Sequence, residues 1–266
     1  MCMLTINIGN DQTKVIEFDP EKVIFKSPET WGPGRRVQLA IIADNGSEVP
    51  LILTIYGARV RFNFSERFKD NNNRISYNIS LDVNDTNDDN LNLLRKKLDR
   101  LYERCVETAV EQDWFGTTDD AKIREYLAHF NTKSEKKNNS GEPFQPMMKV
   151  RFNSLDVHDP NEPPQVPDVN IQLESFNAYT KSTSTKSGHW RDIRKRDVID
   201  IVTEFSHIFI KRREAMPCIK GSSIIKKTSE SNKVVYMKRP APMPTSAPIP
   251  IPVVTPVGGN KRKRVR

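Results

Sequence analysis

Basic side chains alternate with apolar ones in two short segments of this sequence, residues 58–62 and 148–152. Alternate residues of an extended chain point to opposite sides, so Val60 and Phe62 can enter a core while their basic neighbours face outward. A row of such cations can follow the phosphates of a nucleic acid, although any half-exposed sheet also carries polar residues on its outer face. The four cations are Arg59, Arg61, Lys149 and Arg151.

Aromatic residues near these segments could meet the second requirement for binding single strands, a flat face on which a base stacks. Such stacking contributes about 1–3 kcal/mol per base. Trp31 and Trp190 lie in predicted loops, where either ring could accept a base or instead fill the core, and Tyr77 lies on a predicted strand. Further cations next to these rings complete the candidate nucleic-acid-binding site: Arg35, Arg36 and Arg74.

The sequence contains no motif of a catalytic or cofactor site, so we expect neither enzymatic activity nor a cofactor. The glycine-rich loops that bind nucleotides and the elbow that presents a nucleophilic serine are both absent. The three cysteines and four histidines are scattered without metal-ligand spacing, so we expect no metal site. Adjacent acidic residues at 88–89 and 119–120 precede predicted helices, where capping explains them.

Positive charge is concentrated in the last quarter of the chain. The formal net charge is +8, and residues 205–266 contain 14 Lys and Arg against 2 Asp and Glu, so the remaining residues are net negative. A folded part of that kind must bind a polyanion through a local patch. Residues 240–256 contain seven prolines, which predicts an extended segment without a core. We therefore expect a folded domain at residues 1–238 and a disordered, Pro-rich basic tail at residues 239–266.

The predicted tail ends in a dense basic run, for which three roles are open. It could add to DNA affinity by releasing counterions from phosphates, it could direct nuclear import, or it could act as a solubilising arm. The run consists of Lys261, Arg262, Lys263 and Arg264, followed by Val265 and Arg266.

The elements that must position these residues are mostly strands. Residues 51–64 predict a long strand, in which residues 56–64 alternate and Gly57 marks a bulge or bend, and residues 75–83 predict its hairpin partner. Leucines at spacings of three and four from Leu91 onward predict an amphipathic helix, and a shorter helix follows residue 118. Other predicted strands are residues 3–8, 15–18, 147–152, 169–176, 198–205 and 207–211, whereas residues 178–188 are predicted to be an exposed loop.

This order of elements favours a β-rich α+β fold. A helix pair inserted between the strands of a small antiparallel sheet is typical of a closed barrel such as the OB-fold. A bend at Gly57 would allow such a barrel to close. We therefore expect an OB-fold-like antiparallel barrel with an inserted helix pair.

The same segments, in the same order, resemble the single-stranded-DNA-binding proteins of the phage T-seven type, in the version carried by nucleocytoplasmic large DNA viruses. The likeness covers residues 23–211 and depends on order and spacing, because no single motif is diagnostic. It is carried by Ala58–Phe62, Tyr77-Asn78, the leucine-rich helix, Trp114-Phe115-Gly116, Phe144, Pro146 and Met148–Phe152.

The resemblance implies an OB-fold core and a protein that coats and protects single-stranded DNA, whatever its sequence, during viral DNA replication, recombination and repair. It also implies viral replication proteins as partners, and it assigns the basic faces around residues 59–61 and 149–151 to DNA. The phage proteins end in an acidic tail that contacts partner enzymes. The tail of this chain is basic, which puts that regulatory role in doubt.

Two other functions are compatible with the sequence. One is a virion structural or DNA-packaging protein whose basic tail neutralises DNA, and the other is an RNA-binding or transcription factor. No apolar run has membrane-spanning length, so we expect no membrane partner. Three scattered cysteines favour a reducing, intracellular compartment, either the host nucleus or a cytoplasmic viral factory. A homo-oligomer is also compatible with the sequence.

Overall fold

The computed structural model divides the chain into a compact unit, Met1–Glu230, and a C-terminal unit, Ser231–Arg266. It describes residues 3–8, 12–43, 45–69, 74–83, 88–131, 147–156, 165–177 and 180–229. The compact unit ends eight residues before the boundary at 238 that the sequence suggests. The predicted tail at 239–266 lies outside the described residues.

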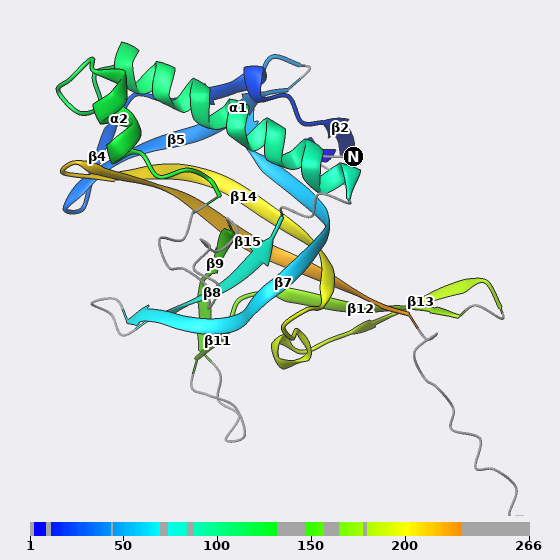
Figure 1. Ribbon diagram of the computed structural model, residues 1–266. Helices are drawn as coiled ribbons and strands as arrows, with labels where there is room; N and C mark the ends of the chain where they lie inside the picture. The colour runs from blue at the N-terminus through cyan, green and yellow to red at the C-terminus, as the bar shows by residue number, and fades with distance from the viewer. Residues whose placement is uncertain are drawn as a thin grey trace, which may run out of the picture. The chain divides into compact units, whose positions relative to one another are not determined.

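Most of the described chain is β-sheet, and two helices accompany it, which confirms the β-rich α+β class (Figure 1). The large sheet has 13 strands. They are β1 (Met3–Ile8), β2 (Gln12–Glu17), β3 (Val23–Phe25), β4 (Glu29–Trp31), β5 (Gly34–Ile42), β6 (Glu48–Pro50), β7 (Ile52–Lys69), β8 (Ile75–Asp82), β9 (Met148–Phe152), β12 (Asn170–Asn177), β13 (Ser182–Ser187), β14 (Val198–Lys211) and β15 (Glu214–Ser229). The remaining two strands, β10 (Ser154–Asp156) and β11 (Gln165–Pro167), pair with each other.

Five strands of the large sheet pair in a continuous series. Strand β7 pairs with β8, β8 with β9, β14 with β15 and β14 with β7, all antiparallel. Strands β9 and β15 run parallel and meet at a single pair of residues, Arg151 and Lys220. Strand β5 continues the sheet beyond β14, and β12 continues it beyond β15.

Gly57 bends the long strand β7, as its place in the sequence predicts. Its φ is +70°, and the register between β7 and β14 shifts at this point, between Ile199 and Ile201. The N–H of Gly57 donates to Oδ1 of Asp200 at 2.9 Å, and Oδ2 of the buried Asp200 pairs with Nζ of Lys227 at 2.6 Å. The bulge is therefore held by a carboxylate that is itself neutralised.

Phe62 does not enter the core, contrary to the simple alternation in the sequence. Ala58 and Val60 are fully buried, but the side chain of Phe62 is 49% exposed. Against β8 the register of β7 shifts between Val60 and Phe62 and again between Phe62 and Ser65. Each extra residue changes which side the following side chains face, so the two-residue period fails here.

The predicted helix pair is present. Helix α1 (Asp89–Glu111) begins at Asp88, whose side chain accepts hydrogen bonds from the N–H groups of Asn90 and Leu91. Helix α2 (Asp120–Tyr126) begins in the same way at Asp119. Helix α1 packs on β7, on β3 and on the 3-10 turn η1 (Pro20–Lys22) (Figure 1). Its apolar stripe is buried, as its spacing predicts: Leu91, Leu94, Leu98, Leu101 and Cys105.

Strands β14 and β15 form a second hairpin, and the sequence did not predict its longer strand, β15. Strand β14 is continuous where two strands are predicted, and β15 has no strong alternation because it contains Pro217 and Gly221. Gly221 is required by close packing, since a Cβ at this position would lie 2.3 Å from the ring of Phe152. The predicted loop at 178–188 was also wrong, because β13 occupies most of it as a fully exposed strand.

Candidate nucleic-acid interface

A groove of about 310 Å³ crosses the surface where β4, β8, β9, β14 and β15 approach one another. We call it the Trp31 groove. It brings together an exposed aromatic ring and basic side chains from parts of the chain that are distant in sequence. Its lining includes the side chains of Trp31, Asn78, Lys149, Arg151, His207 and Met216.

Trp31 stands at the end of β4, in a tight hairpin to β5 closed by Gly32 and Pro33. Gly32 has a φ of +54°, which a glycine adopts without strain. The ring packs edge-on against His207 and Phe209, with centroids 5.3 and 5.5 Å apart. The residue remains 44% exposed, so these contacts hold the indole while leaving part of it open to a ligand.

Lys149 and Arg151 both extend outward from β9, as the alternation predicts. Their neighbours Met148, Val150 and Phe152 are buried. Neither cation makes an ion pair or hydrogen bond with another residue in the part of the chain that the structure describes. They can therefore bind phosphate oxygens without first breaking a salt bridge to a described residue.

The pKa of His207 reflects the positive charge around the same groove. Its pKa is lowered to about 4, mainly because burial disfavours the charged ring and further because Lys220, Arg36 and Arg151 repel a proton on it. Its Nδ1 lies 2.9 Å from Oγ of Ser206. The imidazole is therefore neutral at pH 7, and an anion placed among these cations would favour its protonation.

Two predicted contact residues, Arg35 and Arg36, support the groove instead of lining it. Arg35 donates a hydrogen bond from Nη2 to the carbonyl oxygen of Trp114, just beyond α1. Arg36 pairs with Glu29 across the hairpin, with 2.5 Å between Nε and Oε1. The guanidinium of Arg36 also lies 5.7 Å from the centre of the Trp31 ring. Both arginines thus fix the hairpin that presents Trp31.

Two predicted stacking residues have their rings largely covered. Tyr77 is only 2% exposed, and its hydroxyl donates to the carbonyl oxygen of Gln165 at 2.6 Å. Burial raises the pKa of this hydroxyl. Trp190, in the 3-10 turn η2 (Trp190–Asp192), packs against Phe64 and Tyr77 with centroids 6.2 and 6.1 Å apart. These rings stabilise the core, and neither lines the Trp31 groove.

The remaining predicted cations lie away from the Trp31 groove. Arg59 is exposed on β7 opposite Asp82, Arg61 follows it half-buried, and Arg74 is exposed just before β8. None of the three lines the groove. The basic run at 261–264 falls outside the described residues.

Sequence reasoning missed His207, Phe209 and Met216 as residues of the groove. The sequence showed residues 207–211 as a strand, but nothing in it indicated that this strand lies next to Trp31. Met216 belongs to β15, which was not predicted. A long-range pairing of this kind leaves no local signal in the sequence.

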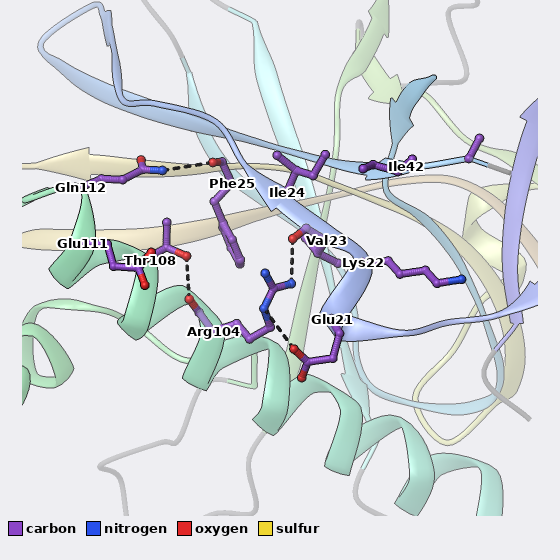
Figure 2. Close-up of a pocket in the computed structure, with 11 residues that line it drawn as sticks. Glu21, Lys22, Val23, Ile24, Phe25, Ile42, Arg104, Thr108, Glu111 and Gln112 are labelled. Atoms are coloured by element: carbon purple, nitrogen blue, oxygen red, sulfur yellow. Dashed lines mark hydrogen bonds and ion pairs between the residues drawn. The ribbon is translucent and has the colours of Figure 1, made fainter. Parts of the chain in front are cut away.

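A larger hollow of about 620 Å³ lies between α1 and β3, but four of its polar side chains are already engaged, those of Glu21, Arg104, Thr108 and Gln112 (Figure 2). Nη1 of Arg104 donates to the carbonyl oxygens of Pro20 and Val23 at 2.5 and 2.7 Å. The same guanidinium pairs with Glu21, with 3.5 Å between Nε and Oε2. This arginine attaches the segment before β3 to α1, so we assign the hollow a structural role.

No protein-family model matches this chain, and no curated protein is significantly similar to it. Among the described residues, no helix is long and apolar enough to cross a membrane. The same residues contain no group of three or more His, Cys, Asp or Glu side chains that could hold a metal ion.

Proposed function

We propose that residues 1–230 bind single-stranded DNA without regard to sequence, through the Trp31 groove. The observation that carries the proposal is the meeting of a half-exposed tryptophan with two outward cations, Lys149 and Arg151, in one hollow. Aromatic faces accept any base, and cations accept any phosphate. The arrangement therefore suits a strand whose bases are unpaired and whose sequence varies.

We also propose that the five paired strands form an OB-type barrel. Support comes from the order of pairing, in which β7, β8, β9, β15 and β14 follow one another and β14 returns to β7. Closure depends on the single pair between β9 and β15. The outer face of such barrels binds single strands in many proteins.

For the biological setting, our proposal follows the family resemblance of the sequence. We propose that the protein coats single strands during viral DNA replication, recombination and repair, with viral replication proteins as partners. The groove is small and holds one half-exposed indole ring, which favours individual unstacked bases over the stacked, paired bases of a duplex.

Competition binding tests this function against the alternatives. A labelled thymidine oligonucleotide bound to the full chain should be displaced by unlabelled single-stranded DNA at a concentration at least about tenfold lower than by duplex DNA of equal length, because stacking requires open bases. Equal competition by duplex would favour a packaging protein. Stronger competition by single-stranded RNA would favour the RNA-binding alternative.

Binding should also strengthen at acid pH because of His207. The free protein holds the pKa of this ring at about 4, below its usual value near 6.5. Phosphates near Arg151 and Lys220 would cancel their repulsion and raise that pKa from about 4, while the burial that lowers it most remains, so binding takes up protons in the acid range. Affinity for oligothymidine should therefore rise between pH 7 and pH 5, by at most about tenfold per unit.

His207→Gln provides the control for this pH effect, because glutamine keeps a polar side chain but does not titrate here. Thymine itself does not titrate in this range. If the affinity of the His207→Gln variant rises with acidity as steeply as that of the native chain, His207 does not cause the pH effect and is not part of the interface.

A further inference from the structure

Phe62 is a large apolar side chain turned outward at a place that the pattern of its own strand assigns to the core. The register shifts on both sides of it make this orientation a property of the backbone. Bulges that re-aim one side chain are common next to binding sites. Exposure of 49% makes Phe62 one of the few large apolar residues on the described surface.

Phe62 lies in the same cross-strand row as Lys149, a cation of the Trp31 groove. Phe62 pairs with Ser80 on β8, and Ser80 pairs with Lys149 on β9. Directly paired residues of antiparallel strands point to the same side, so Phe62 and Lys149 share the outer face. Two strand spacings separate them, which is about 10 Å.

A second cation lies beside this ring. Nζ of Lys195 is 6.0 Å from the centre of the Phe62 ring. The turn that carries Lys195 is fixed to β7, because the N–H of Arg196 donates to the carbonyl oxygen of Val60 at 2.7 Å and the N–H of Val60 donates to that of Asp197 at 2.8 Å. Within the described residues, Lys195 forms no ion pair.

We propose that Phe62 and Lys195 form a second binding position for single-stranded DNA, with a base on the ring and a phosphate on the ammonium group. The DNA strand then runs from the Trp31 groove past Lys149 to Phe62. This inference rests on the proposed function. It extends that function by assigning a direction across β9, β8 and β7 and a contact that the groove alone does not provide.

Length dependence tests the second position. We would measure affinities of the full chain for thymidine oligonucleotides from about 4 to about 16 nucleotides, the range of site sizes for this kind of domain. Phe62→Ala should weaken binding of the longer oligonucleotides by about 5-fold to 100-fold, the loss of one stacked base. Oligonucleotides too short to leave the Trp31 groove should bind as they do to the native chain.

Phe176→Ala is the matched control, because Phe176 is the same residue type with the same exposure of 49% on β12. It should leave all affinities unchanged. Cross-linking with 5-iodouracil oligonucleotides adds a direct readout, since a stacked ring reacts on irradiation, and we expect the adduct on the peptide containing Phe62.

The outcomes separate this inference from the function on which it rests. If the native chain binds no oligonucleotide at low ionic strength, both fail. If Trp31→Ala weakens binding but Phe62→Ala matches Phe176→Ala at every length, only the second position is overturned. If Phe62→Ala changes the sedimentation coefficient of the chain but not its DNA affinity, the ring contacts protein and the inference is likewise overturned.

Discussion

Replacing Lys149 and Arg151 together with alanine should lower affinity for single-stranded DNA by at least about tenfold at low ionic strength. Each phosphate contact on a single strand contributes about 0.7 to the slope of log affinity against log salt, so the slope should become shallower by about 1.4. Both side chains are exposed on β9, and their removal leaves the buried partners of that strand in place. Thermal unfolding should therefore change little.

A charge-matched control separates a local site from general attraction. Lys22 in η1 and Lys96 in α1 are exposed cations that do not line the Trp31 groove. Lys22→Ala with Lys96→Ala removes the same total charge and should change affinity less than about threefold, as expected for distant, screened charges. Similar losses in the two double variants would mean that binding depends on net charge alone.

Replacing Trp31 with alanine should cost about 5-fold to 100-fold in affinity, while the salt slope stays the same. The reason is that the indole supplies stacking, which contributes about 1–3 kcal/mol per base, and no charge. The combination of lower affinity and unchanged slope is opposite to that expected for the two cations. Filter binding or fluorescence anisotropy over a salt series measures both quantities.

Trp31→Phe is the companion variant, because it keeps an aromatic ring against Phe209 and His207. It should recover most of the affinity. A phenylalanine variant as weak as the alanine variant, with both fully folded, would show that the indole does not stack on a base.

Local rules in the sequence were sufficient for the elements that depend on near neighbours. The leucine spacing of α1, its cap at Asp88 and the buried and exposed alternation of β9 all follow from residues a few positions apart. Gly57 was identifiable for the same reason, since only glycine adopts its positive φ without strain. The outward direction of Lys149 and Arg151 was therefore predictable.

The relation between distant elements was not predictable in this way. Trp31 and Lys149 share a groove only because β14 and β15 bring β4 and β9 together, and β15 has no strong pattern of its own. The sequence predicts Tyr77 to be a surface residue beside Arg74, yet its side chain faces the core opposite Phe152. The sequence predicts Phe62 to be a core residue, yet two register shifts in β7 turn its side chain outward.

The most direct test uses the compact unit by itself. Residues 1–230, without the basic C-terminal segment, should bind a long thymidine oligonucleotide at low ionic strength, and the Lys149→Ala, Arg151→Ala double substitution should weaken that binding at least about tenfold. If the shortened chain does not bind, or binds as well with the double substitution as without it, the Trp31 groove is not the DNA site.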